Sequence, residues 1–162
     1  MTAEQAAQYR AGLIALAREE IGEAEPLLRA LAAELPDDAD VRAFLATAWF
    51  AQGRIEEARA AMSLALALGP DRFAPNIKAG EFDLRLGDLD AAELHFKQAL
   101  RVAAHGSRDA AAARTLLGET RQRAGRSIVR QASFPRWHRP AVLRRPGPGR
   151  LSTPLEDGGI IE

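Results

Sequence analysis

Two stretches of the sequence decide the fold: 51–70, AQGRIEEARAAMSLALALGP, and 85–104, RLGDLDAAELHFKQALRVAA. The two stretches align without a gap when the sequence is compared with itself and residue 53 is matched to residue 87. We call the distance between these two positions the repeat spacing. The same shift superimposes residues of similar type along much of the chain: Gly12, Ala46 and Gly80; Ala24, Ala58 and Ala92; Leu28, Met62 and Phe96; Pro36 and Pro70; Gly53 and Gly87. A register kept at so many positions predicts a supersecondary unit that is repeated along the chain.

Each unit carries the pattern of two amphipathic helices. Apolar residues recur at spacings of three and four, as in 44–49 and 55–65. A glycine between the two stretches, Gly53 or Gly87, can end the first helix in the left-handed conformation, and a proline stops the second. The predicted helices run over 4–18, 21–35, 38–52, 55–68, 72–86 and 89–104.

The predicted helix ends have their own signals. Asp37, Asp38 and Asp71 follow the stopping prolines and are expected to N-cap the next helix. Pro26 is expected to fall in the first turn of its helix, where a missing N–H is not needed.

The composition agrees with an all-α protein. Alanine and leucine dominate and aromatic residues make up only 6%, which favours helices over sheets. The chain has no cysteine, which excludes disulfides, thiolate metal sites and cysteine nucleophiles. The N-terminal region lacks the pattern of a secretory signal, and no apolar run approaches the ~20 residues of a membrane span. We therefore expect a soluble, cytoplasmic protein.

The repeated residues resemble those of the tetratricopeptide repeat (TPR) family. Unit 39–72 fits that family best, through Leu45, Ala46, Trp49, Gly53, Ala58, Met62, Ala65 and Pro70. Unit 73–106 departs from the pattern at Asp83, where an aromatic residue is usual, and unit 5–38 departs at Glu19, where the turn glycine belongs. The resemblance implies a right-handed α-solenoid of three helix pairs.

The remainder of the chain divides into a cap and a tail. The stretch 107–125 is predicted to form a helix that covers the exposed face of the last pair, as the end of a solenoid requires. The repeat domain would then span 1–125. The tail, 126–162, is rich in proline and glycine and is predicted to be mostly irregular.

The net charge of zero hides an asymmetry between the two parts of the chain. Residues 1–106 carry 11 basic and 17 acidic side chains, a net charge of −6, whereas residues 107–162 carry 11 arginines and five acids, a net charge of +6. The stretch 120–150 holds nine arginines and no acid. The predicted body is acidic and the tail is basic.

The sequence gives little support for catalysis. None of the three histidines, His95, His105 and His138, has a partner at metal-binding spacing on a helix face, so no metal site is predicted. His95 is predicted to lie on a helix surface or between repeats. No phosphate loop or nucleophile motif occurs, and no cofactor is predicted. We therefore expect a protein that is not an enzyme.

The resemblance to the TPR family also implies a binding surface, because the first helix of each pair lines a concave groove in that fold. The residues predicted to face a protein or peptide partner are Tyr9, Leu13, Phe44, Thr47, Phe50, Ile77, Lys78, Glu81 and Arg85. Arg10 and Leu16 are predicted to share the groove face of the first helix. Family members that grip a C-terminal carboxylate pair use basic and amide residues at five positions, which here hold Tyr9, Leu13, Phe44, Ala74 and Lys78. Only Lys78 matches, so a carboxylate clamp is not expected. An adaptor or scaffold that binds an apolar segment is the favoured interpretation.

Two rival functions and several roles for the tail remain open. The length, the three repeats and the apolar groove are also similar to those of type III secretion chaperones, which shield hydrophobic clients. Arginines next to aromatic residues could instead bind single-stranded nucleic acid. The tail could also lie along the acidic body, bind another protein, or serve as a linker. The residues predicted to make tail contacts are Phe134, Trp137, Arg139, Arg144 and Arg145, and we expect Trp137 to be partly buried.

Overall fold

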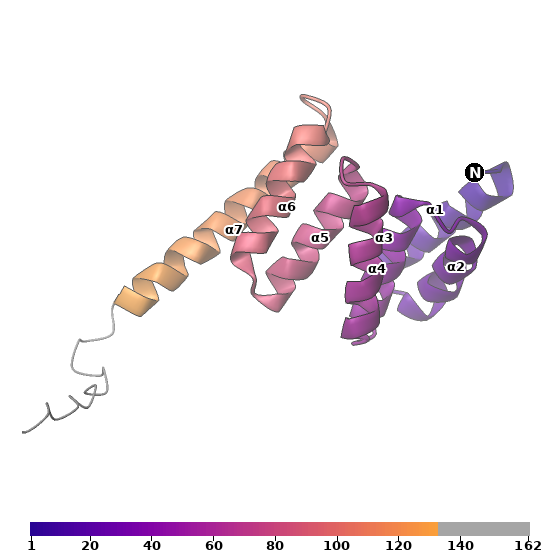
Figure 1. Ribbon diagram of the computed structural model, residues 1–162, viewed down its shortest axis with the longest axis horizontal. Coiled ribbons are helices and arrows are strands. Elements are labelled where there is room, and N and C mark those ends of the chain that lie inside the picture. The colour runs from indigo at the N-terminus through magenta and orange to yellow at the C-terminus, as the bar shows by residue number, and fades with distance from the viewer. Residues whose placement is uncertain (133–162) are drawn as a thin grey trace, which may run out of the picture.

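The computed structural model describes the backbone of residues 1–132 and the side chains of residues 1–126. This part of the chain forms seven helices and no strand. The helices are α1 (Ala3–Ala17), α2 (Ile21–Glu34), α3 (Ala39–Ala51), α4 (Ile55–Leu68), α5 (Phe73–Leu86), α6 (Leu89–Val102) and α7 (Arg108–Ala132). Successive helices run in opposite directions, and the pairs α1–α2, α3–α4 and α5–α6 stack along the molecule (Figure 1). The prediction of an all-α helical-repeat solenoid is confirmed.

A contact between a small and a large residue holds each helix pair together. The three contacts recur at the repeat spacing and involve Gly12 with Leu28, Ala46 with Met62, and Gly80 with Phe96. A Cβ atom added to Gly80 would lie only 2.5 Å from the Phe96 ring, and one added to Gly12 would lie 3.0 Å from Leu28 Cγ. Such close packing requires the small residue that the repeat pattern places there.

The second helix of each pair contributes a further small residue to the core. Ala24, Ala58 and Ala92 are all fully buried. These alanines follow one another at the repeat spacing, and all three are buried to the same extent. Positions that are equivalent in the sequence repeat therefore occupy equivalent places in the packed structure.

The turn inside each pair has the same geometry in all three repeats. Positions 19, 53 and 87 adopt positive φ angles of 61°, 78° and 85°. The next amide N–H in each turn donates a 2.9 Å bond to the carbonyl five residues earlier, from Glu20 to Ala15, from Arg54 to Trp49 and from Asp88 to Asp83. The left-handed conformation predicted for Gly53 and Gly87 is confirmed. Glu19 adopts it as well, although its Cβ atom makes the conformation costly.

Three predictions about helix ends are wrong, those for Asp37, Asp71 and Pro26, and the prediction for Asp38 is confirmed. Asp38 caps α3 by accepting hydrogen bonds from the N–H groups of the first turn. Asp71 does not cap α5, because its carboxylate lies 2.6 Å from the Arg101 guanidinium and contacts α6 instead. Pro26 is the sixth residue of α2, which begins at Ile21, so it lies beyond the first turn. At that position a proline removes a hydrogen bond of the helix interior.

Helix α7 covers the last helix pair. It packs against α6 and α5 and buries Ala113, Leu117 and Thr120. The Arg121 guanidinium lies 3.1 Å from the Glu93 carboxylate of α6. The helix continues to Ala132, past the end predicted at residue 125, so the segment predicted as irregular begins with helix.

No helix in the described part of the chain is long and apolar enough to cross a membrane.

A concave groove on the first helices of the pairs

A groove of about 560 Å³ is formed mainly by α1, α3 and α5, the first helices of the three pairs. Its lining residues are Leu13, Leu16, Ala17, Glu19, Ile21, Phe44, Thr47, Ala51, Lys78, Glu81 and Arg85. Of the residues predicted to face a partner, the structure brings together Leu13, Phe44, Thr47, Lys78, Glu81 and Arg85 at this surface. A volume in this range is typical of sites that hold a small ligand or a few side chains of a partner.

One side of the groove is apolar and continuous with the protein core. Leu16, Ile21 and Phe44 are partly buried and pack against the core formed by α1, α2 and α3. Leu13 is also partly exposed at this surface. Because the core fixes these side chains, an apolar group that entered the groove would meet an ordered surface and not a mobile one.

The opposite side, on α5, is charged. The Lys78 ammonium group lies 2.8 Å from the Glu81 carboxylate and 5.6 Å from the centroid of the Phe44 ring. The Arg85 guanidinium lies 5.7 Å from the centroid of the Phe50 ring. Arg85 is exposed and makes no ion pair with any described residue. Lys78 is therefore neutralised within the protein, whereas Arg85 offers a free cation over an aromatic ring.

Three residues predicted to face the groove are not among its lining residues. Tyr9 packs edge-on against Phe44, with ring centroids 5.9 Å apart. Burial raises the pKa of Tyr9 well above its usual value, and the nearby carboxylates of Asp40 and Asp38 raise it further, so the phenol stays neutral. Ile77 is buried in the core between α5, α6 and α7 and does not face the groove.

Phe50 lies beside the groove in an aromatic contact that the sequence did not indicate. Its ring packs against Phe82 at an interplanar angle of 52°, with centroids 4.6 Å apart, and Phe82 is almost fully buried. A small recess next to the main groove is lined by Phe50 and Phe82 together with Thr47 and Arg85. Phe50 thus contributes to the contact between the second and third helix pairs as well as to the surface.

Four lining residues were missed by the sequence analysis: Ala17, Glu19, Ile21 and Ala51. They lie at the ends of α1 and α3, in the turn after α1 and at the start of α2. For Glu19 the sequence did contain a signal. Glu19 occupies the same repeat position as Gly53, which places it in the turn between the two helices of a pair. The predicted surface contains only residues of the first helices, whereas the groove extends to the turns at their ends.

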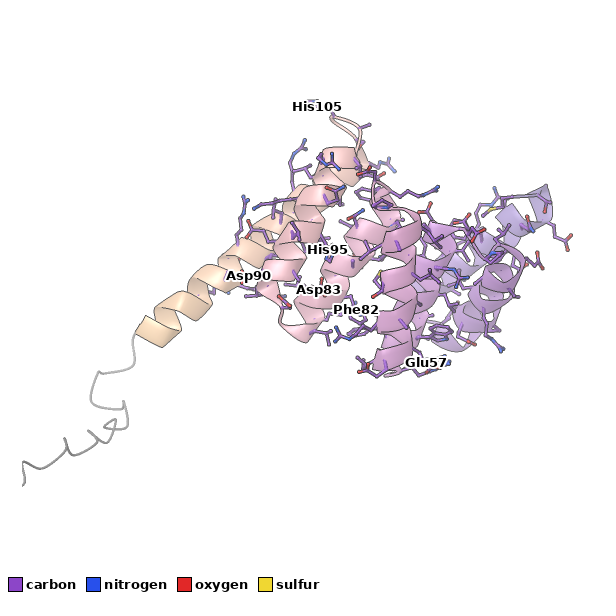
Figure 2. All side chains as sticks on the ribbon, in the orientation of Figure 1. Glu57, Phe82, Asp83, Asp90, His95 and His105 are labelled. Atoms are coloured by element: carbon purple, nitrogen blue, oxygen red, sulfur yellow. The ribbon has the colours of Figure 1, made fainter. Side chains whose placement is uncertain are left out.

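A polar contact outside the groove joins α5 and α6. His95 Nδ1 and Asp83 Oδ2 are 2.8 Å apart, and both side chains are largely buried (Figure 2). His95 therefore joins the two helices of one pair, whereas the sequence predicted a position on a helix surface or between repeats. The described residues hold no group of three or more histidine or acidic side chains arranged to bind a metal.

Comparison with known proteins agrees with this geometry. Residues 15–79 match the sequence profile described as tetratricopeptide repeat. Residues 15–79 belong to the TPR family. No curated protein sequence matches the chain significantly.

Two solved structures are similar in fold to most of this chain. The crystal structure of the Sgt2 TPR domain from Aspergillus fumigatus superimposes with a TM-score of 0.67, at 23% identity, over 83% of this chain and 87% of that one. A crystal structure of a T3SS complex from Aeromonas hydrophila superimposes with a TM-score of 0.61, at 23% identity, over 77% of this chain and 85% of that one. At this level of identity the likeness establishes the fold.

The residues predicted to make tail contacts, Phe134, Trp137, Arg139, Arg144 and Arg145, lie outside the described residues. Their role stays a prediction.

Proposed function

We propose that this protein is a non-catalytic adaptor or scaffold that holds a segment of another protein in the concave TPR groove. The observation that carries the proposal is the pairing of an apolar wall, formed by Leu13, Leu16 and Phe44, with the unpaired cation of Arg85. TPR domains are interaction modules, and the groove is where this chain combines shape with exposed binding groups.

The arrangement suits a segment with apolar anchors. Burial of one large aliphatic or aromatic side chain contributes roughly 1.5–3 kcal/mol, so two anchors against this wall contribute about 3–6 kcal/mol, whereas micromolar binding needs a net of about 8 kcal/mol. Micromolar affinity therefore also requires polar contacts, such as a charge-assisted hydrogen bond with Arg85. Aromatic and arginine side chains are also the residue types that dominate binding energy at interfaces. Phe44, and Arg85 near Phe50, supply both types.

The test blocks the groove without disturbing the core. Ala51 is exposed and lines the groove at the end of α3, so Ala51→Arg adds a long charged side chain to the site. Ala60 is equally exposed, lies on α4 and does not line the groove, so Ala60→Arg is the matched control. Both variants should keep the wild-type helical signal.

Affinity purification with quantitative mass spectrometry then measures partner recovery. We expect Ala51→Arg to lower the recovery of a specific partner at least tenfold and Ala60→Arg to leave it unchanged. Equal recovery from all three proteins would refute the groove as the binding site. Ala51→Arg is a better test than truncation of Phe44 and Phe50 to alanine, because those two rings also support the fold.

Two narrower alternatives predict other outcomes of the same purification. A chaperone of the type III secretion class, favoured by the fold similarity to the Aeromonas complex, would recover a hydrophobic client that is insoluble without it. Nucleic-acid association through the basic tail would be insensitive to Ala51→Arg and would fall steeply with added salt.

A further inference from the structure

We propose that the groove has an internal ligand: the C-terminal stretch 155–162, LEDGGIIE, of the same chain. This inference rests on the proposed function, because it identifies a segment that an external partner must displace from the same site. Four observations support it: the chemistry of the stretch, the direction of α7, the acidic character of the edge where α7 ends, and the length of the connection.

The chemistry of the stretch complements that of the groove. Residues 133–154 carry five arginines and no acid, whereas the stretch 155–162 combines three aliphatic residues with three acids, Glu156, Asp157 and Glu162. The groove offers an aliphatic and aromatic wall and one unpaired cation, Arg85. Aliphatic side chains against the wall and a carboxylate against Arg85 would satisfy both features at once. No other part of the chain outside the described residues offers this combination.

The direction of α7 brings the tail to the correct edge of the molecule. Helices α5, α6 and α7 alternate in direction, so the C-terminal end of α7 lies on the same edge as the C-terminal end of α5 (Figure 1). Arg85 lies in the last turn of α5, at that edge. The chain therefore leaves α7 on the side where the charged end of the groove is located.

The acidic character of this edge assists the connecting segment. The turns within the helix pairs lie there, and exposed acids occupy them or the first turns of the helices that follow, namely Glu20, Glu23, Glu56, Asp88 and Asp90. Figure 2 shows Glu57 at this edge of α4, with His105 at the opposite edge of the molecule. The arginines that precede the stretch 155–162 would pass these acids. Each such attraction is weak, but together they favour a path toward the groove over a path into solvent.

The connection is long enough to reach the groove. Twenty-two residues, 133–154, separate Ala132 from Leu155. At roughly 3.3–3.6 Å per residue they span up to about 75 Å, and as a flexible chain they cover about 25 Å on average. Ala132 lies twelve residues beyond Thr120, which is the last described residue of α7 that is fully buried, so the connection first covers about 18 Å along α7. Packed helices lie about 10 Å apart, so the two steps from α7 to α5 and from α5 to α3 add about 20 Å. The total of about 40 Å is within the extended reach of the connection, and the tether raises the effective concentration of the stretch 155–162 at the groove.

The experiment uses the full chain, and the absence of native cysteine makes it clean. One double variant pairs Ala51→Cys in the groove with Gly159→Cys in the stretch 155–162. The control pairs Ala60→Cys on α4 with the same Gly159→Cys. Both alanines are exposed, so neither replacement disturbs the core. The rate of disulfide formation under mild oxidation is followed on non-reducing gels and assigned by peptide mass spectrometry.

We expect the groove pair to form an intramolecular disulfide at least tenfold faster than the control pair. Adding Arg85→Glu should slow the groove pair severalfold, and adding Ile160→Asp with Ile161→Asp should remove its advantage. Equal rates for the two pairs, or a groove advantage that survives both sets of changes, would overturn the proposal. A disulfide that forms only between two molecules, at a rate that rises with protein concentration, would also overturn it and assign the groove to a second copy.

This outcome is separate from the test of the proposed function. If Ala51→Arg lowers partner recovery while the two cysteine pairs react equally fast, the groove binds an external segment and the internal ligand does not exist. If the groove pair reacts faster and partner recovery does not change with Ala51→Arg, the internal ligand stands and the external site lies elsewhere.

Discussion

The turn at Glu19 provides the sharpest test of the repeat geometry. Positions 19, 53 and 87 are equivalent, and all three have positive φ, but only position 19 is not glycine. Glu19 is exposed and makes no side-chain hydrogen bond or ion pair within the described structure. No interaction of the Glu19 side chain therefore offsets the strain energy of the left-handed backbone. Glu19→Gly should stabilise the protein.

The magnitude follows from two opposing terms. A residue with a Cβ atom in the left-handed conformation costs roughly 1–2 kcal/mol, and Glu19→Gly removes that cost. Glycine gives the unfolded chain more freedom, which lowers stability by about 0.4–1 kcal/mol. The expected net gain is about 0.5–1 kcal/mol in the free energy of unfolding. The reverse change, Gly53→Ala, should lose a similar amount, because no atom lies within 4 Å of the Cβ position and the backbone alone decides.

Urea unfolding followed by circular dichroism at 222 nm measures the difference, provided that the denaturant slope is unchanged. Glu19→Ala is the matched control, since it removes the charge and keeps the Cβ atom. Glu19→Gly should be more stable than both the wild type and Glu19→Ala. If Glu19→Gly and Glu19→Ala have the same unfolding midpoint, the charge and not the backbone determines the effect, and the strain at this turn does not exist.

Three further outcomes follow from the packing. Ala58→Arg should lower the free energy of unfolding by about 3 kcal/mol or more, because a charged side chain would enter a fully buried site; a melting temperature within one or two degrees of the wild type would contradict the register. Truncation after Ala104 should expose the apolar face of α6 and cause aggregation, whereas truncation after Gly125 keeps the buried contacts of α7 and should leave a soluble, helical protein, as size-exclusion chromatography can show. His95→Ala leaves Asp83 largely buried without its partner and should cost about 1–3 kcal/mol by urea unfolding, and a cost below about 0.5 kcal/mol would show that water replaces the histidine.

The fold could be predicted from the sequence because its signals are local and repeated. A glycine with positive φ, a small residue against a large one, and a proline after the second helix recur at one spacing, so each repeat checks the others. The predicted N-cap at Asp71 failed because a more distant residue, Arg101, competes for the carboxylate. Propensity rules consider neighbours along the chain and do not include such contacts between helices.

The groove could be predicted only in part, for a different physical reason. Helix periodicity assigns a residue to one face, and that was sufficient for Leu13, Phe44 and Arg85. It does not show how far a neighbouring helix covers that face. Ile77 was assigned to the groove for this reason, although the packing of α6 and α7 buries it. Residues in turns, such as Glu19, belong to no helix face and have no periodic signal.

The third repeat shows that the packing position is preserved where the residue type is not. Asp83 and His95 are equivalent to Trp49 and Ala61, each displaced along the chain by the repeat spacing. In the second repeat, a large residue on the first helix packs in the cluster that contains a small one on the second. In the third, a short acid on the first helix meets a larger histidine on the second, and a 2.8 Å contact joins them. The larger side chain lies on the first helix in the second repeat and on the second helix in the third repeat. The polar atoms of Asp83 and His95 that are buried in this arrangement contact each other, so neither lacks a hydrogen-bond partner. Asp83 departs from the family pattern as a single residue, but it fits the repeat as half of a pair, because the space between the two helices is filled by both side chains together.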